Sequence, residues 1–431
     1  MAKINRFMAE YKDHMTTLPN TTKSSAPPKI VMRRFIRLFK EVDDARIQGM
    51  IDYPLSEILV IAFLAVLSGA NTWIDISDFG DGYIRFLKKF LKLKNGIPSH
   101  DTFRRVFSLI DTDQLQQATV AFLMENITSI KKVLGIKDDG LRQICIDGKE
   151  QRGTGRKYNY DEKIRNLQTL HIYDASNEIC LFSKAIAEKT NEIPVAQEVL
   201  KDMNLKGSVV TFDALHTQKE TIRIIAEKKG DYVGGLKGNQ GILKSEAENA
   251  FTQEVLDSIK DTDAYYETSE KAHGQIEVRR YYMTKAKHRF NGYVEWQNLR
   301  NFVCYQKYTC NVIDGKEKTE TRYYITSLRE VILCAEAIRG HWSIENTLHW
   351  HLDYSFYEDM NSTMDKNAFN NLSVINKMAL SLCKLVQPIH HNVGLRTIRK
   401  SFGWNHEKGL SELLSNFDEE TLRITLENVK K

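Results

Sequence analysis

The sequence predicts an α/β fold in which a mixed sheet with flanking helices is preceded by a helical region and interrupted by a β-rich insertion. Three observations support this prediction. Between residues 141 and 236 the hydrophobic pattern gives three strands, a helix, a strand, a helix and a strand, in that order. Residues 53–134 repeat their apolar positions with helical spacing. Residues 262–327 contain several runs of aromatic and β-branched residues, which favour strands.

The elements of the predicted core follow one another closely. A strand over residues 141–147 leads into a basic loop, and residues 166–173 and 178–186 flank the turn sequence DASN, so these segments predict an antiparallel meander. The elements after it are a helix at 192–203, a strand at 207–212, a helix at 217–228 and a strand at 231–236. This order is that of a ribonuclease H-like fold, in which carboxylates gather at strand ends, and the assignment is a fold-level analogy.

Three acidic residues stand where such a chain would direct carboxylates into one pocket. Asp147 in ICIDGKE and Asp213 in VVTFDALHT each close a predicted strand. Glu345 belongs to a set that recurs every fourth position, as on one helix face: His341, Glu345, His349 and Asp353. Taken singly, an aspartate after a strand is as readily a turn residue or a helix cap.

Carboxylates in this arrangement suit metal-dependent cleavage of phosphodiester bonds. Mg²⁺ prefers oxygen ligands, keeps several waters, and is usually held by one or two carboxylates plus substrate phosphate. In a two-metal site the ions lie about 3.5–4 Å apart and clamp the attacking and leaving oxygens of an in-line displacement. Asp147, Asp213 and Glu345 therefore predict a metal-dependent nuclease site.

Long segments of the chain resemble one family in the same order: YPLSEILVIAFLAVLSGANTWIDISDFG, GIPSHDTFRRVFSLID, DGKEQRGTGRK, LHIYDASNEICLFSKAIAEKTNEIPVAQEVL, TFDALHTQKETIRIIAEKKGDYVGGLKGNQ and RGHWSIENTLHWHLDYSFYEDMNSTMDKNAFNNLSVINKMAL. Over residues 35–390 the chain is similar to the H-repeat-associated insertion-sequence transposases, a DDE family. The resemblance implies a transposase that cleaves DNA at element ends and transfers strands into target DNA, using two Mg²⁺ ions for which Mn²⁺ can substitute. It places the catalytic triad and the metal ligands on Asp147, Asp213 and Glu345.

Around the glutamate the chain departs from a signature of many related DDE transposases. That signature is a Tyr, two residues, an Arg, three residues, the Glu, six residues and a Lys. This chain has Ile338, His341 and Leu352 at the Tyr, Arg and Lys places, and Arg339 lies nearby but out of register. We therefore expect His341 and His349, on the same helix face, to make the phosphate contacts that the missing basic residues would make, and Arg339 to be a further DNA contact.

Further DNA contacts are predicted beside the first aspartate. The loop after Asp147 is rich in basic residues and contains Gly153 and Gly155, so it can place cations along the scissile strand. Lys237, after the strand at 231–236, is expected on the same rim. The contacts predicted in this region are Lys149, Arg152, Arg156, Lys157 and Lys237, with charge compensation beside the carboxylates as the alternative.

Composition divides the chain into six predicted segments. Residues 1–40 are a basic arm with nine Lys or Arg against two acidic residues, expected to contact phosphates or to be a solvated tail. Residues 41–136 form a helical domain for recognising DNA ends, with a scaffold or dimerisation role as the alternative. The catalytic core is predicted in two parts, residues 137–261 and residues 328–390, and the second part contains the glutamate helix. Between them lies the β-rich insertion at 262–327, for which the resemblance implies a grip on DNA. Residues 391–431 are predicted to form a helical C-terminal tail.

Several local features are also predicted. The apolar run Ile58–Leu67 indicates a buried helix, with Ser56 as its cap and Gly69 near its end. Ser99 is the expected cap of the helix that follows it. Trp296 in the insertion is interpreted as a core aromatic, with stacking in place of a flipped base as the alternative.

The composition is that of an ordinary globular protein of two or three domains, with 42% hydrophobic residues, 27% charged residues and a net charge of +5. The longest apolar run is about half of a membrane span, so no membrane association is expected. Six cysteines without a Cys-x-x-Cys pair favour free thiols in a reduced cytoplasm. The resemblance implies double-stranded DNA as the partner, both terminal inverted repeats and target, bound by a homodimer in the bacterial nucleoid.

Two other functions fit parts of the pattern. His341, Glu345 and His349 could seat zinc in a hydrolase, although the chain lacks the His-Glu-x-x-His arrangement and this function leaves both aspartates without a role. The second alternative is a transposase-derived DNA-binding protein without catalytic activity. Metal preference separates the first from a nuclease, and binding without cleavage would identify the second.

Overall fold

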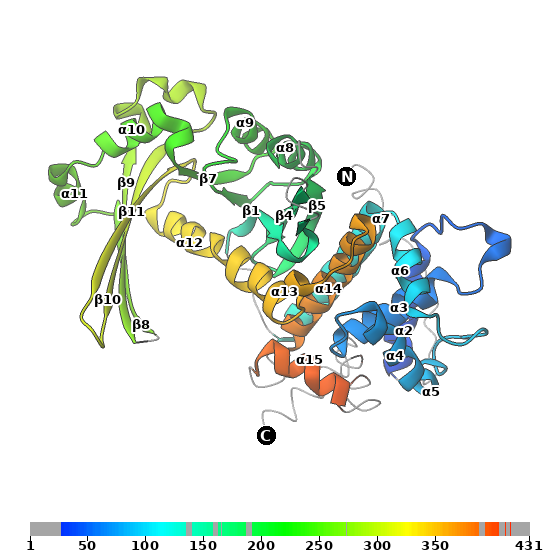
Figure 1. The fold of residues 1–431 in the computed structure, drawn as a ribbon. Coiled ribbons are helices and arrows are strands. Elements are labelled where there is room, and N and C mark those ends of the chain that lie inside the picture. The colour runs from blue at the N-terminus through cyan, green and yellow to red at the C-terminus, as the bar shows by residue number, and fades with distance from the viewer. Residues whose placement is uncertain are drawn as a thin grey trace.

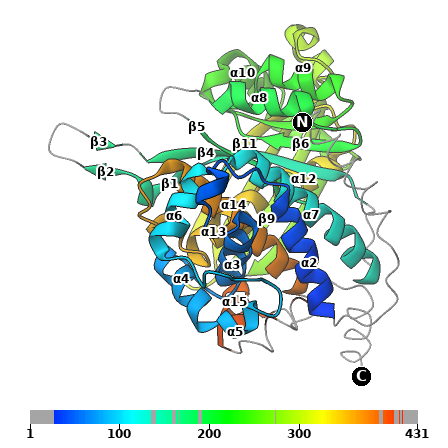
Figure 2. The same ribbon diagram turned by 90° about the vertical axis from the view of Figure 1, so that its right-hand side faces the viewer.

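One long mixed sheet and a bundle of helices at one side of it make up the described part of the chain (Figures 1 and 2). The computed structural model describes residues 27–134, 140–157, 163–164, 166–186, 192–272, 274–387, 393–404, 410 and 414. The strand order in the sheet is β5-β4-β1-β6-β7-β11-β10-β9-β8. The strands are β1 (Arg142–Gln151), β4 (Leu167–Asp174), β5 (Ile179–Ile186), β6 (Ser208–Phe212), β7 (Asp231–Leu236), β8 (Tyr265–Ala272), β9 (Gln275–Lys285), β10 (Asn301–Asn311) and β11 (Glu317–Thr326), with β2 (Arg156–Lys157) and β3 (Lys163–Ile164) as a separate pair.

The centre of the sheet is parallel and consists of β1, β6 and β7. Parallel neighbours need a crossover connection, and α9 (Lys219–Glu227) supplies it between β6 and β7. α8 (Glu192–Asp202) leads from β5 into β6, while β4 and β5 extend the sheet antiparallel from β1. The predicted meander and the predicted strand and helix order are both present, so the ribonuclease H-like α/β fold class is confirmed.

β1 does not end at Asp147, and this part of the prediction was wrong. The strand continues to Gln151 because residues 147–151 pair antiparallel with residues 167–171 of β4. The parallel partner β6 ends at Phe212, opposite Ile146, so Asp147 is the first residue of β1 beyond that partner. From Asp147 onward, β1 is therefore paired with β4 on one side and no longer with β6 on the other.

The predicted β-rich insertion continues the same sheet beyond β7. β11 pairs antiparallel with β7, and β10, β9 and β8 follow in antiparallel order. Figure 1 shows these long strands projecting from the body of the molecule. The short helices around them are η3 (Gly238–Gln240), α10 (Gly241–Asn249), α11 (Gln253–Ile259), η4 (Ala286–His288) and η5 (Asn291–Glu295). The domain boundaries predicted from the sequence thus cross a continuous sheet and stay predictions.

Trp296 belongs to the core beneath this part of the sheet. Its exposed fraction is 6%, and it lies in one apolar cluster with Leu299 and Phe302. The interpretation as a core aromatic is confirmed.

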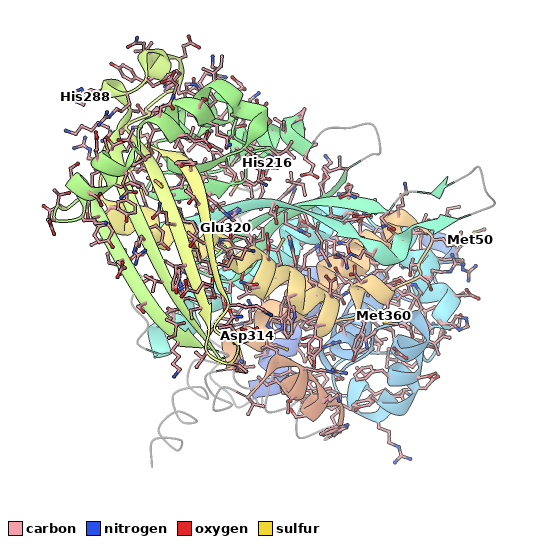
Figure 3. All side chains as sticks on the ribbon, turned by 60° about the vertical axis from the view of Figure 1, so that its left-hand side comes forward. Met50, His216, His288, Asp314, Glu320 and Met360 are labelled. Atoms are coloured by element: carbon pink, nitrogen blue, oxygen red, sulfur yellow. The ribbon has the colours of Figure 1, made fainter. Side chains whose placement is uncertain are left out.

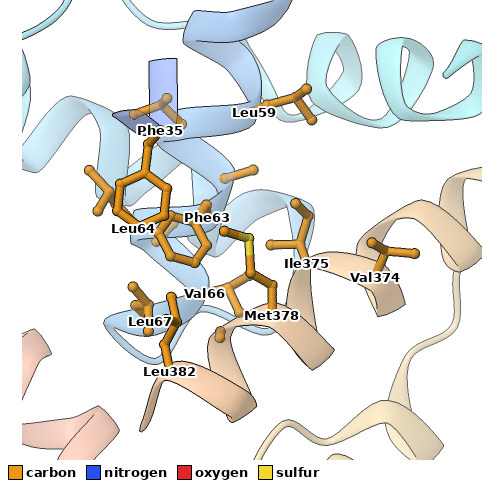
Figure 4. Packing of buried hydrophobic residues seen from close by; sticks show 14 of the residues in the cluster. Phe35, Leu59, Phe63, Leu64, Val66, Leu67, Val374, Ile375, Met378 and Leu382 are labelled. Carbon is orange, nitrogen blue, oxygen red and sulfur yellow. The ribbon is translucent and has the colours of Figure 1, made fainter. Parts of the chain in front are cut away.

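Helix α14 (Lys366–Val386) is the centre of the helical bundle. α3 (Leu55–Leu67), α6 (His100–Leu109) and α7 (Thr112–Leu134) contact it, and α14 and α7 also contact β5. Figure 4 shows Phe63 of α3 packed near Ile375 and Met378 of α14. A late segment of the chain therefore ties the N-terminal helices to the sheet. The remaining helices of the bundle are α2 (Pro27–Lys40), η1 (Gln48–Met50), α4 (Trp73–Gly82) and α5 (Ile84–Leu87).

The three predicted helix ends have different outcomes. The Ser99 side chain accepts a hydrogen bond from the Thr102 amide and caps α6, as predicted. Gly69 has a φ of +106°, a left-handed backbone that glycine tolerates best, just after α3. Ser56 is not a cap, because Pro54 occupies the capping position and Ser56 lies in the first turn, buried like every residue of α3.

The glutamate-bearing helix is not one regular α-helix. α12 (Val331–His341) leads into η6 (Ile344–His349), a π-helix, and then into α13 (Trp350–Tyr354). π-helical turns are rare and occur frequently at functional sites. The prediction that His341, Glu345, His349 and Asp353 share one face of a regular α-helix was therefore wrong. The chain continues through η7 (Glu358–Met360) to α14 and then α15 (Leu395–Trp404).

All six cysteines are free, as predicted. Cys304 and Cys310 lie on the same strand, β10, so they cannot form a cross-strand bridge with each other. Among the residues that the structure describes, no helix is both long enough and apolar enough to cross a membrane. Most of the predicted basic arm, residues 1–26, lies outside the described residues.

Candidate active site

Asp147, Asp213 and Glu345 line one cavity of about 580 Å³. Asp147 comes from β1, Asp213 follows the end of β6, and Glu345 lies on η6. Three carboxylates from segments far apart in the sequence are thus brought to one place. Glu248 and Glu320 line the same cavity, and Figure 3 labels Glu320.

The carboxyl group of Asp147 has a strongly raised pKa. Its side chain is 22% exposed, and burial, followed by the negative charges of Glu345 and Asp213, raises its pKa to about 7. The amide of Gly148 acts in the opposite direction through a hydrogen bond. Like charges held near one another with so little solvent disfavour ionisation. A bound cation would relieve this repulsion.

This pKa predicts an unusual effect of Asp147→Asn on stability. A folded-state pKa of about 7, above the ordinary 3.8, means that folding favours the protonated acid. That preference is fully present below pH 3.8 and is lost as the pH rises toward 7. In EDTA at pH 8, Asp147→Asn should therefore increase the free energy of unfolding, by up to about 4 kcal/mol at about 1.4 kcal/mol per pKa unit. Urea unfolding at pH 8 and pH 5 measures this, and the gain should be smaller at pH 5. An equal or larger gain at pH 5 would contradict it.

Asp213 combines a turn role with an exposed oxygen. Its Oδ1 accepts the amide of Leu215 at 2.8 Å and that of His216 at 3.4 Å, which fixes the loop after β6. Its Oδ2 lies 3.8 Å from Nζ of Lys237, and the Asp213 side chain is 37% exposed. The turn interpretation and the metal-ligand prediction are therefore compatible, because they use different oxygens.

Two histidines lie directly behind Asp147. His349 Nδ1 is 3.8 Å from Asp147 Oδ2, and His349 Nε2 shares a 3.0 Å hydrogen bond with Nδ1 of His171. His171 is fully buried on β4, in register opposite Asp147. Burial, with the positive charges of Lys149 and Lys377 next, lowers the pKa of His349 to about 3. Both imidazoles are therefore neutral at physiological pH, and the His349 ring lies next to the Asp147 carboxylate.

His341 is also neutral. Its Nδ1 shares a 3.0 Å hydrogen bond with Oγ1 of Thr211 on β6, and burial lowers its pKa to about 4. The prediction that His341 and His349 replace the basic residues of the family signature stays a prediction. As neutral imidazoles they would offer a phosphate a hydrogen bond and no positive charge.

Lys149 is buried and does not face the cavity. Its Nζ forms ion pairs with Asp353 and, at 3.4 Å, with Glu358, and its side chain is 5% exposed. Burial lowers its pKa, but Glu358 and Asp353 outweigh burial and hold the pKa above its ordinary value. Lys149 therefore connects β1 to the segment after Glu345, which contradicts its predicted role as a DNA contact.

The remaining predicted contacts lie at different places. Lys237 is 73% exposed at the cavity rim, and Arg152 is exposed on η2 (Arg152–Thr154). Arg339 is half exposed but pairs with Glu270 of β8 at 2.7 Å, on the side of α12 that faces the insertion. The backbones of Arg156 and Lys157 form β2, and their side chains lie outside the described residues.

Sequence reasoning missed a further acidic residue beside Asp147. Glu192, at the start of α8, lies 3.5 Å from Nε2 of the buried His216, and Figure 3 labels His216. A Cβ added at Gly148 would lie 2.6 Å from Oε2 of Glu192, so a side chain at this position would displace the carboxylate from where it lies. The signal available in the sequence was the glycine itself, because glycine within a strand often marks a close approach.

The carboxylates of Asp147, Asp213 and Glu345 suit Mg²⁺, although they do not enclose a metal ion completely. In the described ranges, no three His, Cys, Asp or Glu side chains cluster closely enough to enclose a metal ion. Mg²⁺ does not need such a cage, since it keeps waters and uses substrate phosphate alongside one or two carboxylates. Zinc sites need three or four convergent ligands. His341 and His349 instead contact two different strands, so nothing supports the zinc-hydrolase alternative.

Comparison with known families decides the assignment. Residues 138–382 match the model described as "Transposase DDE domain", which covers more than half of the chain and includes Asp147, Asp213 and Glu345. The chain belongs to the DDE transposase family. Residues 36–123 match the model described as "DDE_Tnp_1-associated", so the helical bundle also has a counterpart in this family. The resemblance to insertion-sequence transposases is confirmed.

Relatives of the DDE transposase family match most of the chain. It is 32% identical to "Putative transposase YncI" of Escherichia coli O157:H7 over 84% of this chain and 90% of that protein. It is 30% identical to "H repeat-associated putative transposase YhhI" of Escherichia coli (strain K12) over 81% and 90%. A cryo-EM structure of a piggyBac transposase synaptic complex with hairpin DNA matches at 11% identity and a TM-score of 0.39 over 96% of this chain and 86% of that chain. A score that low supports no inference about this chain.

Proposed function

We propose that the chain is an insertion-sequence transposase that cuts phosphodiester bonds at the ends of its element and joins them to target DNA. The observation that carries this proposal is the convergence of Asp147, Asp213 and Glu345 on one cavity within the matched family domain. The raised pKa of Asp147 supports it, because a carboxylate perturbed by burial and by neighbouring carboxylates in a cavity is typical of functional sites.

Asp147 and Asp213 would hold divalent cations, and Glu345 would complete the site. Bound Mg²⁺ or Mn²⁺ would activate the attacking water or 3′-hydroxyl and stabilise the leaving oxygen. His349, which shares a hydrogen bond with His171, lies beside the Asp147 carboxylate, and the turn at Leu215 and His216 uses Oδ1 of Asp213, so Oδ2 faces Lys237. Lys237 at the rim would bind the scissile phosphate, since its ammonium is exposed beside Asp213.

The partners follow from this chemistry. Double-stranded DNA carrying the terminal inverted repeats, and then target DNA, would enter over the rim, with Arg152, Arg156 and Lys157 on the flank of β1. Two element ends must be held together, so we infer a homodimer in the DNA complex. The helical bundle would recognise the ends and the β-rich insertion would grip the DNA, within the segment boundaries predicted above.

Binding of the metal is expected to raise the free energy of unfolding, so it can be measured without a cleavage assay. At a concentration of about 100 times Kd, Mn²⁺ should add about 2.7 kcal/mol to the free energy of unfolding of the wild type. The effect should weaken from pH 8 to pH 6, because protons compete for Asp147. Urea unfolding with and without Mn²⁺ measures it.

The control for this experiment is Glu320→Gln, which removes a carboxylate that lines the same cavity but pairs with Arg322 at 2.6 Å. This variant should respond to Mn²⁺ like the wild type, whereas Asp147→Asn should not respond. Equal stabilisation of Asp147→Asn and the wild type would contradict the proposed metal site.

A further inference from the structure

The surface just beyond the catalytic glutamate carries an exposed pair of stacked aromatic rings. Trp350 and Tyr354 of α13 stack with centroids 4.5 Å apart and an angle of 22° between the rings. They are 49% and 48% exposed. Large aromatic side chains are usually buried much more deeply than this. Trp350 is five residues beyond Glu345, within about 8 Å along the helix axis at about 1.5 Å per residue.

A cation extends this stack. The guanidinium of Arg396 on α15 lies 5.0 Å from the ring centre of Tyr354 and 5.4 Å from that of Tyr357, and it hydrogen-bonds the Tyr357 hydroxyl. We call Trp350, Tyr354 and Arg396 the aromatic platform. A guanidinium plane next to aromatic rings is an arrangement on which nucleobases stack well.

Helix α15 is held firmly in this position. Its buried Arg399 donates to the carbonyl of Val66 at 2.7 Å and also to the carbonyl of Ser355, directly after α13. Arg399 lies one turn from Arg396 on the same side of α15, so its contacts fix the position of Arg396 over Tyr354. A preformed surface of this kind loses little conformational freedom when a ligand binds.

The charge around the platform favours a polyanion. The sequence of α15, LRTIRKSFGW, contains Arg396, Arg399 and Lys400 and no acidic residue. Of the acidic residues near α13, Asp353 and Glu358 pair with Lys149 and Asp359 accepts the amide of Arg152, while the exposed Glu345 belongs to the proposed metal site. An acidic protein surface would find the cations but would have no use for two stacked rings, whereas nucleic acid uses both.

We propose that the aromatic platform binds unpaired DNA bases beside the active site. Bases of an intact duplex are stacked on one another, so the platform fits a single strand, such as one freed near a cut made at Glu345. The rings would stack on the bases and Arg396 with Lys400 would contact the phosphates. This inference rests on the proposed function, because that function supplies the single strand.

The test is a binding titration in EDTA, followed by fluorescence anisotropy. The probes are a labelled oligothymidine of about 20 nucleotides, an abasic oligomer of equal length, and a duplex of that length. The wild type should bind oligothymidine more tightly than the abasic oligomer. The double variant Trp350→Ala with Tyr354→Ala should bind oligothymidine about 5- to 100-fold more weakly, with its affinity for the abasic oligomer and the duplex unchanged within about twofold.

Two controls keep this result interpretable. Ile332→Ser alters an apolar residue of α12 whose exposed fraction, 47%, matches that of the two rings, and it should bind every probe like the wild type. Tyr354→Phe keeps the ring and should retain binding to oligothymidine. Thermal melting of each variant checks its folding, which should persist because the replaced side chains are half exposed.

The inference is overturned if the double variant binds oligothymidine like the wild type, or if the wild type does not distinguish oligothymidine from the abasic oligomer. Because EDTA prevents cleavage, this outcome is independent of catalysis. A wild type that binds oligothymidine through the platform but never cuts DNA with Mg²⁺ would contradict the proposed function and leave the platform standing.

Discussion

Replacement of any one of the three carboxylates, as Asp147→Asn, Asp213→Asn or Glu345→Gln, is expected to reduce DNA cleavage by more than about a thousandfold. Each variant removes one negative charge and one oxygen ligand from a cavity that must neutralise metal cations. DNA affinity should change by less than about threefold, since the exposed basic residues are untouched. The rate of cleavage of repeat-bearing DNA at saturating protein measures the first effect, and anisotropy measures the second.

The same cavity provides matched controls. Glu248 and Glu320 also line it, but they pair with Lys244 at 2.9 Å and Arg322 at 2.6 Å. Glu248→Gln and Glu320→Gln should cleave within about tenfold of the wild-type rate. A triad variant with wild-type cleavage would remove that residue from the triad. Losses as large in the controls would show that the total charge of the cavity, and not these three ligands, determines the rate.

Lys149→Ala is expected to destabilise the fold by about 3–5 kcal/mol. The substitution removes the cation that faces Asp353 and the buried Glu358, and an uncompensated buried charge is strongly destabilising. The loss should appear in urea unfolding as a lower transition midpoint with an unchanged dependence on urea concentration.

Lys237→Ala is the matched substitution, since Lys237 is 73% exposed. It should change stability by less than about 0.5 kcal/mol while weakening binding to DNA. The reverse pattern, with Lys149→Ala stable but impaired in DNA binding, would reinstate Lys149 as a DNA contact and contradict the structural role assigned to it.

The fold could be predicted well wherever local pattern decides structure. The strand predicted at 231–236 is β7 residue for residue, and the insertion's strands fall on the predicted aromatic runs. What the pattern could not show is pairing between distant segments. β1 continues past Asp147 because of β4, and the insertion joins the core sheet through β11 and β7. The spacing of hydrophobic residues along a strand does not show which distant strand it pairs with.

The acidic residues of the site could be predicted, but the charges around them could not. Asp147, Asp213 and Glu345 were identified from position and resemblance, and the structure brings them to one cavity. The basic or ionisable type of Lys149, His341 and His349 suggested contacts with DNA, yet burial decides what these groups do. The buried Lys149 forms ion pairs with Asp353 and Glu358, and burial lowers the pKa of both histidines so that they are neutral.

The most direct test of the central claim is cleavage of an end-labelled duplex that carries the inverted repeat flanking the gene, by purified protein in Mg²⁺, Mn²⁺ or EDTA. We predict cuts at the repeat boundary with either metal, none in EDTA, and none by Asp213→Asn, whose DNA binding persists. Specific binding of the repeat without a cut under any metal would contradict this account and identify a DNA-binding protein that no longer catalyses transposition.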